Sequence, residues 1–318
     1  TTLFRSVRRE PPRIVIHGGP GIGKTTLASR APNPVFIDLE HGTLQIDVAR
    51  IEGIETWEGL LAALRAFATE PHDFKTVVID TLDRAEWLCW QHICQTERVP
   101  NIEKVGKGFG KGYTAAYEAF RGLAAALEKL RTERGMAVII LGHSIVKSFK
   151  NPEGEDYDRY QLKLHDKAAG LIKEWCEVVG FLRFEEGGAK IQGDKAINKR
   201  ARGWHTGRRI MHLSRTAAWD AKSRLSLPAE IELDRTHPWA PFRNARDEAH
   251  DSTDAEIRTS IGAELARLGE SFTSGSGRPG TAAQILAALE HPATDRPTLD
   301  RILSGLRASE PTTTSTES

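Results

Sequence analysis

The chain has 318 residues, of which 39% are hydrophobic, and this is enough for one large or two modest folded domains. Its formal net charge of +1 excludes an overall positive field that would attract nucleic acid, so any nucleic-acid-binding surface must be a local basic patch. Cys89, Cys94 and Cys176 lack metal-type spacing, and with no secretory signal and no apolar run of roughly 18 residues we expect a cytoplasmic protein without membrane contact.

Short apolar runs alternate with helical patterns between Arg13 and Leu141. The expected strands are Arg13–His17, Val35–Asp38, Thr76–Asp80 and Ala137–Leu141. The expected helices follow Lys24 and cover Trp57–Thr69, Leu82–Glu97 and Thr114–Arg134. Because strands that alternate with helices form parallel sheets covered on both faces, the sequence predicts an α/β fold with a mostly parallel sheet.

The pattern changes from about Glu177 onward, where strands separated by turns replace the alternation. These expected strands are Val178–Phe184, Ala189–Ile191, Arg209–Leu213 and Glu230–Leu233. They predict an antiparallel extension at one edge of the sheet. After Pro238 the chain becomes polar, and we expect small helices over Asp254–Leu268 and Thr281–Leu289.

This organisation predicts four parts. An N-terminal segment covers 1–12, an α/β core covers 13–238, and a small C-terminal helical region covers 239–310, with a linker over 271–280. Residues 311–318 are rich in Ser and Thr and are expected to be disordered.

Residues Gly18–Thr25 read GGPGIGKT and come directly after the first expected strand. They fit the pattern G-x-x-x-x-G-K-[ST], in which backbone N–H groups and a helix N-terminus hold a phosphate chain. Lys24 would reach the β- and γ-phosphate oxygens of ATP, and Thr25 would ligate Mg²⁺. The alternative is a chance match in a glycine-rich turn. The predicted ATP-binding residues are Gly18, Gly19, Pro20, Gly21, Ile22, Gly23, Lys24, Thr25 and Thr26.

Two carboxylates follow strands whose carboxyl ends should meet the phosphate loop. Asp80 ends the most apolar strand and is expected to hold Mg²⁺ through water, the alternative being an ordinary strand-end aspartate. Glu40 comes just past the second strand, where it could polarise the water that attacks the γ-phosphate. The alternatives for Glu40 are a solvated loop residue or, as in nucleoside and shikimate-type kinases, part of the region that recognises the acceptor. The phosphate loop and the carboxylate of Glu40 together predict ATP binding and hydrolysis.

Three segments resemble RecA-type recombinases. FIDLEH, over Phe36–His41, resembles the strand that ends in their catalytic glutamate, here Glu40, and VVIDTL, over Val77–Leu82, resembles their Walker B strand. VIILGHSIVKSF, over Val138–Phe149, resembles the strand whose last polar residue senses the γ-phosphate and leads into a DNA-binding loop. The resemblance covers Arg13–Asp234 and implies a RecA-like P-loop NTPase core in which DNA binding is coupled to ATP hydrolysis.

One further stretch resembles a smaller group within this family. AKSRLSLPAEIEL, over Ala221–Leu233, is similar to a stretch of the short, core-only phage RecA-like ATPases, which are grouped with phage single-strand annealing proteins. RecA-type recombinases carry an N-terminal polymerisation segment, whereas only 1–12 precede the first expected strand here. The likeness implies a phage or prophage protein of the bacterial host cytoplasm that acts in recombination or repair. The implied sensor residue is His143, where recombinases usually have glutamine.

The resemblance also implies partners and an active site shared between subunits. The partners are single-stranded DNA, further copies of the chain in a ring or filament, and a single-strand DNA-binding protein. RecA-type cores complete hydrolysis with basic residues near the end of the core sheet, which reach the γ-phosphate of the neighbouring subunit. Here Lys222 and Arg224 occupy that place, on a polar stretch that is expected to be exposed; the alternative is a solvated pair on a turn.

A basic glycine-rich stretch, KVGKGFGKGY over Lys104–Tyr113, is the first candidate DNA surface. Lys104, Lys107 and Lys111 alternate with glycines and flank Phe109. A flexible basic loop with an aromatic stacking platform suits single-stranded nucleic acid, although a solvated connection between helices fits the same composition.

Two further stretches are candidate DNA surfaces. Ile145–Gln161, expected as a long polar loop, resembles the second DNA loop of the family and holds Lys147 and Lys150, but its acidic residues nearly cancel its charge. Lys195–Arg209 is a basic hairpin that could grip a phosphate backbone or be merely solvated.

Three functions are open at this point. The first is a DNA-stimulated ATPase of phage recombination that promotes single-strand binding or annealing. The second is a nucleotide-switched scaffold, such as a helicase loader or another regulatory ATPase. The third, a small-molecule kinase, is less favoured because no arginine-bearing lid follows the third expected strand.

Overall fold

The computed structural model describes residues 10–188, 203–225, 227–234, 238–239, 257–268, 271–273, 279–290, 296–307 and 310–311. Its contacts divide the chain into a larger unit over Arg9–Asn244 and a smaller unit that includes Ala245–Ser318. The predicted boundary at 238 lies slightly before this division.

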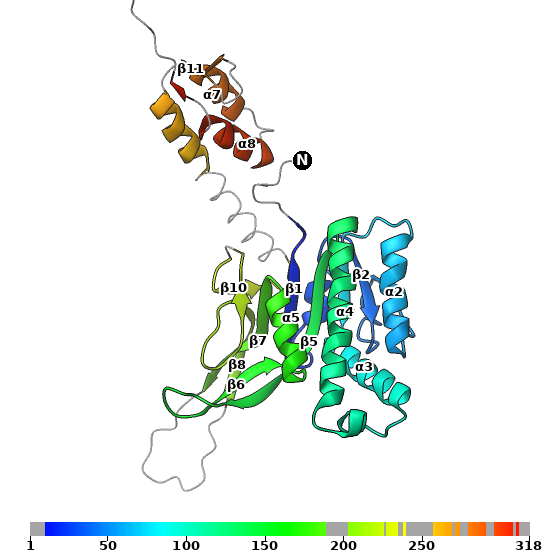
Figure 1. Cartoon of the computed structure of the whole chain (residues 1–318). Helices are drawn as coiled ribbons and strands as arrows, with labels where there is room; N and C mark the ends of the chain where they lie inside the picture. The colour runs from blue at the N-terminus through cyan, green and yellow to red at the C-terminus, as the bar shows by residue number, and fades with distance from the viewer. Residues whose placement is uncertain are drawn as a thin grey trace, which may run out of the picture. The chain divides into compact units, whose positions relative to one another are not determined.

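A mostly parallel sheet forms the centre of the larger unit, as predicted (Figure 1). Its main path runs in the order β10-β8-β7-β1-β5-β4-β2-β3. The parallel members are β1 (Arg13–Gly18), β2 (Pro34–Asp38), β3 (Ala49–Ile51), β4 (Thr76–Asp80), β5 (Ala137–Phe149) and β7 (Val178–Gly188). The strands β8 (Gly203–His212) and β10 (Glu230–Leu233) continue the sheet in antiparallel fashion, which confirms the predicted extension. The predicted strand Ala189–Ile191 lies outside the described residues.

The register of the parallel strands brings their carboxyl ends to one edge of the sheet. β5 lies between β1 and β4, so that Gly18 pairs with His143 while Asp80 pairs with Leu141. Asp38, at the end of β2, pairs with Asp80. The phosphate loop and the ends of β2, β4 and β5 therefore meet at this carboxyl edge, where ligands bind in open α/β sheets.

Helices cover the sheet, and the hydrophobic core lies between the helices and the strands. They are α1 (Lys24–Ala28), α2 (Trp57–Thr69), α3 (Leu82–Glu97), α4 (Lys111–Arg134) and α5 (Asp166–Trp175), with the short 3₁₀ helix η1 (Ile102–Lys107) before α4. α2 begins where Thr56 accepts a hydrogen bond from the Gly59 N–H at 3.0 Å. Alternate strand residues such as Val15 and Val77 pack with Leu64 and Phe120 of the helices. The bounds of α2 and α3 are as predicted, and α4 begins one turn earlier than predicted.

The segment after Leu141 corrects the predicted loop over Ile145–Gln161. β5 continues through Phe149 and turns back into β6 (Tyr157–Leu162), and the two strands pair in antiparallel fashion from Ser144 with Leu162 to Phe149 with Tyr157. The prediction of a loop was wrong because a hairpin strand can be largely polar when it projects beyond the sheet. We call β5 from Ser144 onward together with β6 the projecting hairpin.

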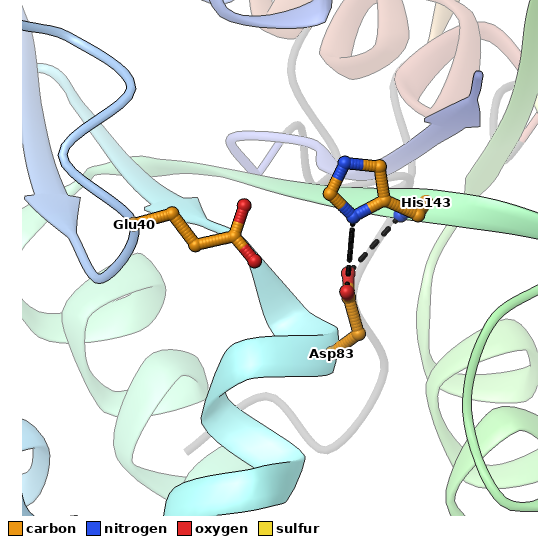
Figure 2. Close-up of side chains that lie close together, drawn as sticks. All are labelled: Glu40, Asp83 and His143. Carbon is orange, nitrogen blue, oxygen red and sulfur yellow. Dashed lines mark hydrogen bonds and ion pairs between the residues drawn. The ribbon is translucent and has the colours of Figure 1, made fainter. Parts of the chain in front are cut away.

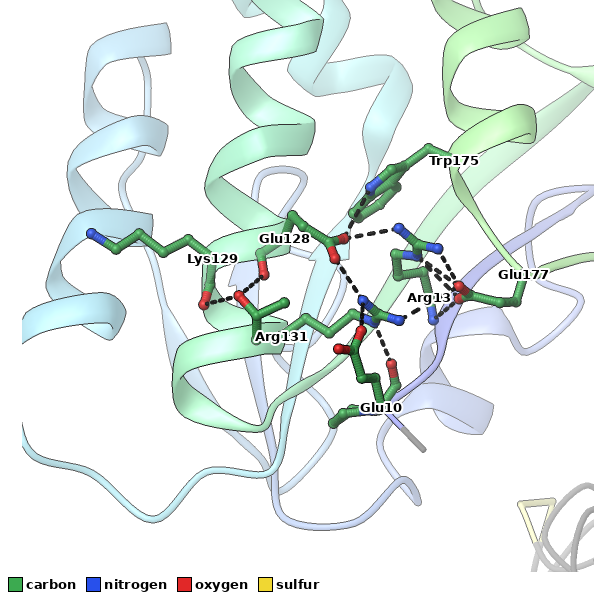
Figure 3. A network of polar contacts seen from close by, with 9 residues as sticks. Glu10, Arg13, Glu128, Lys129, Arg131, Trp175 and Glu177 are labelled. Atoms are coloured by element: carbon green, nitrogen blue, oxygen red, sulfur yellow. Dashed lines mark hydrogen bonds and ion pairs between the residues drawn. The ribbon is translucent and has the colours of Figure 1, made fainter. Parts of the chain in front are cut away.

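A network of charges ties the opposite, amino edge of the sheet together (Figure 3). Nε of Arg13 on β1 donates to Oε1 of Glu177 at 2.9 Å, and Nη1 of Arg13 donates to Oε2 of Glu128 on α4, also at 2.9 Å. Arg131 donates to the other oxygen of Glu128 at 2.6 Å and to the Pro11 carbonyl at 2.7 Å. Burial raises the pKa of Glu177, but the hydrogen bonds from Arg13 outweigh this and leave it below its ordinary value. The network therefore joins β1, α4 and the start of β7.

The smaller unit has its own small core. A helix over 257–268, α7 (Ala282–Glu290) and α8 (Arg296–Arg307) are its helices, and the buried residues are Ile257, Ile261, Leu265, Leu268, Leu299, Leu303 and Leu306. The predicted linker over 271–280 is wrong at both ends, because β11 (Ser271–Thr273) and β12 (Pro279–Thr281) pair in antiparallel fashion. β13 (Glu310–Pro311) pairs with β11 and takes up the start of the predicted tail, of which 312–318 lie outside the described residues.

Candidate nucleotide-binding site

The phosphate loop connects β1 directly to α1. Gly21 and Gly23 adopt φ values of 70° and 99°, which favour glycine and let the loop wrap around an anion. The buried Lys24 ammonium donates to the carbonyls of Gly18 at 3.1 Å and Gly19 at 2.9 Å. A bound phosphate chain would offer this ammonium stronger, charged acceptors than the two carbonyls. Ile22 is buried and anchors the loop.

The predicted Mg²⁺ residues lie in contact. Thr25 Oγ1 donates to Asp80 Oδ2 at 2.8 Å, across the space between α1 and the end of β4. Burial, together with the nearby carboxylates of Asp38 and Glu40, raises the pKa of Asp80 to about 6, although the hydrogen bond from Thr25 opposes the shift. Excess negative charge beside a threonine hydroxyl fits a hard divalent cation such as Mg²⁺, which takes oxygen ligands and would compensate these carboxylates. Thr25 would ligate the ion, and Asp80 would hold one of its waters.

Asp38 is a site residue that the sequence analysis missed. Its Oδ1 accepts from the Gly42 N–H and its Oδ2 accepts from the Thr43 N–H, both at 3.0 Å. Burial alone would raise the pKa of Asp38, but hydrogen bonds from the Thr43 hydroxyl and from these N–H groups hold it below its ordinary value. Asp38 therefore fixes the turn that carries Glu40. An aspartate followed by a short polar turn with Gly42 was the available signal.

The predicted catalytic glutamate lies at the opening of the site. Glu40 is exposed, and its Oε1 accepts a hydrogen bond from Thr81 Oγ1 at 2.8 Å. Figure 2 shows its carboxylate reaching from the turn after β2 toward Asp83 and His143, and ligand atoms of these three residues lie within 4.8 Å of one another. This position leaves one face of the carboxylate free to polarise a water molecule.

The predicted sensor residue has an acidic partner. His143 Nδ1 lies 2.9 Å from Asp83 Oδ2, and the His143 backbone N–H donates to Asp83 Oδ1 at 3.1 Å. This hydrogen bond raises the pKa of His143 and favours the imidazolium, while burial opposes it. A cation at this place is suited to detect a γ-phosphate. Asp83, in the first turn of α3, was not identified from the sequence.

Most of these groups line one pocket of about 320 Å³, while Asp38 and Asp83 lie behind residues of its lining. The lining residues are Pro20, Gly21, Gly23, Lys24, Thr25, Thr26, Glu40, Gly42, Ile46, Asp80, Thr81 and His143. Most of them are predicted from the sequence. Gly42, Ile46 and Thr81 are not, because their participation depends on the turn after β2 and on the start of α3.

The first candidate DNA stretch forms the end of η1, a short connection and the first residues of α4, rather than a loop throughout. Phe109 is 98% exposed, and Lys104, Lys107 and Lys111 around it are exposed as well. Five consecutive residues, 106–110, have positive φ, between 57° and 94°. Ile102 and Val105 are buried in the core, so the base of the loop is anchored while its tip faces solvent. We call 104–111 the basic loop.

The other predicted lysines are engaged within the fold. Lys147 pairs with Asp166 at 2.7 Å, and Lys150 pairs with Asp156 within the projecting hairpin. The charges of both predicted DNA-binding lysines are therefore compensated within the fold. Of the basic hairpin Lys195–Arg209, residues 195–202 lie outside the described residues.

The predicted trans-acting pair lies at the amino edge, away from the pocket of its own subunit. β9 (Lys222–Ser223) pairs with the start of β7, at Val178 and Val179, whereas Gly18 of the phosphate loop pairs with Leu182. The expectation that the whole pair is exposed is wrong for Lys222, which is half-buried and donates to the Lys173 carbonyl. Arg224 is exposed.

The comparisons agree with this geometry. Residues 10–225 match the model of a family described as an AAA domain, and this range contains every residue that lines the pocket. No curated protein matches the chain. Across the part of the chain that the structure describes, no helix is long and apolar enough to cross a membrane. Because the match spans more than half of the 318 residues, the chain belongs to the AAA domain family of P-loop ATPases.

Proposed function

We propose that this protein is a RecA-like ATPase that couples ATP binding and hydrolysis to the binding or annealing of single-stranded DNA. In this proposal it is encoded by a phage or prophage, works in the bacterial cytoplasm and serves recombination or repair. ATP and Mg²⁺ occupy the pocket, with Lys24 on the phosphates, Thr25 and Asp80 on the metal, and Glu40 as the residue that activates water.

The observation that carries the DNA part of the proposal is the basic loop. Phe109 is 98% exposed at the tip of an anchored loop, so its ring is open to a ligand, and three exposed lysines surround it. Bases stack on such a ring, and the three surrounding lysines can follow a phosphate backbone. α4 runs from this loop to Arg131, which contacts Pro11 at the amino edge. The basic loop therefore lies toward the carboxyl edge of the sheet (Figure 1), the edge at which β1 ends in the phosphate loop.

Contacts between the pocket and the basic loop support coupling between the two ligands. Asp83, which holds His143, lies one helical turn from Glu86 on α3, and both Glu86 oxygens accept from the His165 N–H, at 3.0 and 3.2 Å. The His165 ring stacks on Tyr113 at the start of α4, with ring centroids 4.1 Å apart. A change at His143 could reach the basic loop through these packed groups.

Self-association is part of the proposal. Arg224 lies at the amino edge and the pocket lies at the carboxyl edge, so a head-to-tail ring or filament would place Arg224 of one subunit near the nucleotide of the next. There it would act as an arginine finger in trans. A single-strand DNA-binding protein remains an expected partner on the family resemblance alone.

The decisive experiment measures ATP turnover with and without single-stranded DNA. We expect DNA to stimulate turnover, and the variant Lys104→Gln/Lys107→Gln/Lys111→Gln to lose most of this stimulation while its basal turnover persists. The matched control replaces the same lysines with arginine, which keeps the charges. Loss of three phosphate contacts should reduce the slope of log affinity against log salt by about 2. Turnover that ignores DNA would instead favour a nucleotide-switched scaffold, and phosphate transfer to a small molecule would favour a kinase.

A further inference from the structure

Arg209 lies against the phosphate loop although it comes from a strand on the far side of β7. It sits on β8, where it pairs with Phe184 of β7, and β7 in turn pairs with β1 at Gly18. A Cβ atom added at Gly23 would lie 2.9 Å from Nη1 of Arg209 and 3.2 Å from its Cζ. The guanidinium therefore packs directly on the residue that precedes Lys24, where a φ of 99° favours glycine.

Arg209 and its neighbour Arg208 carry the same charge but differ in their acidic partners. Arg208 forms ion pairs with Glu185 at 3.1 Å and with Glu232 at 2.6 Å. Its charge is therefore compensated within the fold. Among the residues that the structure describes, no carboxylate forms an ion pair with Arg209. Its Cζ lies 5.9 Å from the centre of the Phe184 ring. A half-buried guanidinium without an acid, set beside a loop built for an anion, is suited to a ligand that brings the negative charge.

The direction of approach indicates which phosphates it meets. Glu40, Asp80 and His143 come from the ends of β2, β4 and β5, which all lie on one side of β1. In the proposed function His143 contacts the γ-phosphate, Asp80 holds the metal and Glu40 activates the attacking water. Arg209 reaches the loop from the other side of β1, the side of β7 and β8.

We propose that Arg209 binds the α- and β-phosphates of the nucleotide in its own subunit, as a second cation beside Lys24. The guanidinium gives planar, charge-assisted hydrogen bonds to phosphate oxygens, and these bonds are made equally to ATP and ADP. This inference rests on nucleotide binding at the phosphate loop but is independent of DNA binding and of the trans-acting Arg224.

The test is calorimetric titration of the full chain with Mg²⁺ and either ADP or the slowly hydrolysed analogue ATPγS, without DNA. Arg209→Met fills a similar volume without charge, Arg209→Lys keeps a charge, and Arg208→Ala is the matched control on the same strand. We expect Arg209→Met to weaken both nucleotides by about 10-fold or more and to flatten the salt dependence of binding, since a phosphate contact is lost. Arg209→Lys should retain much of the affinity, and Arg208→Ala should bind like the unmodified protein.

Thermal melting of each variant ensures that only folded protein is compared. Binding by Arg209→Met equal to that of the unmodified protein would show that the side chain only supports the loop, and would overturn the inference. A loss confined to ATPγS would equally overturn it, since the contact would then be to the γ-phosphate. If the unmodified protein binds neither nucleotide, the proposed function fails with it, so the two failures are distinguishable.

Discussion

His143 and Asp83 form a bidentate pair that joins the end of β5 to the first turn of α3: Nδ1 of the imidazole and the backbone N–H of His143 contact the two oxygens of one carboxylate, at 2.9 and 3.1 Å (Figure 2). β5 leads on into the projecting hairpin, and α3 leads on toward the basic loop. His143 therefore contacts the elements that lead to both of these segments.

The first prediction concerns this pair. His143→Ala should abolish the effect of ATP on single-stranded DNA affinity, because no group then reads the γ-phosphate. The hydrogen bond with Asp83 raises the pKa of His143, so its imidazolium is present at low pH and is lost as the pH rises through that pKa. The effect of ATP should decline over the same range. His143→Gln removes this pH dependence, and coupling that survives in His143→Ala would exclude the sensor role.

The second prediction assigns the attack on the γ-phosphate. Glu40→Gln keeps the shape of the side chain and its hydrogen bond from Thr81 but loses basicity, so turnover should fall by about 100-fold or more while ATP affinity persists. Thr81→Val, which only releases the carboxylate, should have a smaller effect. Joint loss of affinity and turnover would indicate a structural or metal-binding role, and full activity would make Glu40 a bystander.

The third prediction concerns the metal. Asp80→Asn leaves an acceptor for the Thr25 hydroxyl but removes the charge that orients a metal-bound water. The affinity for Mg²⁺ in the presence of ADP should fall by about 10- to 100-fold, as for other residues that act on a metal through its ligands. Binding of ADP in the presence of EDTA serves as the control and should be unchanged. Unaltered Mg²⁺ dependence would remove Asp80 from the metal site.

The fourth prediction tests completion of the site in trans. Arg224→Ala and Glu40→Gln proteins should each be nearly inactive, but a mixture should regain some turnover, because some interfaces then pair an intact Glu40 with an intact Arg224. Lys222→Ala is the matched control: its ammonium donates within its own subunit, so the turnover of this variant should not depend on mixing with another protein. No recovery in a mixture that demonstrably co-assembles would leave Arg224 without a catalytic part.

The phosphate site could be predicted from the sequence because its chemistry is local or strand-bound. Gly18–Thr25 is continuous, and Glu40, Asp80 and His143 each follow an apolar run whose carboxyl end must reach the same edge of a parallel sheet. The strand Thr76–Asp80 and the helix Leu82–Glu97 have the predicted bounds for the same reason: their burial patterns are regular and their ends are marked.

The parts that could not be predicted depend on contacts distant in sequence. Arg209 reaches Gly23 only because β8 folds back on β7, and no local pattern separates it from Arg208. Asp83 follows the Walker B strand as an ordinary helix residue, and only the register of β5 brings His143 onto it. The projecting hairpin was expected as a loop because its residues are stabilised by each other rather than by a buried face.

The last prediction concerns a buried acid between the pocket and the basic loop. Glu86 is buried on α3, and burial raises its pKa from 4.5 to about 7, with Asp83 adding to the shift and the hydrogen bond from the His165 N–H opposing it. The folded state therefore holds this proton at pH values where the unfolded chain has released it. The free energy of unfolding must then decrease as the pH rises between about 4.5 and 7, and it should not change further above that range on account of this group.

Glu86→Gln imitates the protonated carboxyl and can still accept from the His165 N–H. The variant should be more stable than the unmodified protein at about pH 8, by at most about 3 kcal/mol, and the difference should disappear toward about pH 4.5. Urea unfolding at both pH values measures this, with Glu118→Gln on the exposed face of α4 as the control that should show no such trend. A Glu86→Gln protein that is less stable at pH 8, or whose advantage is the same at both pH values, would show that Glu86 is ionised in the folded state and that its charge is used there.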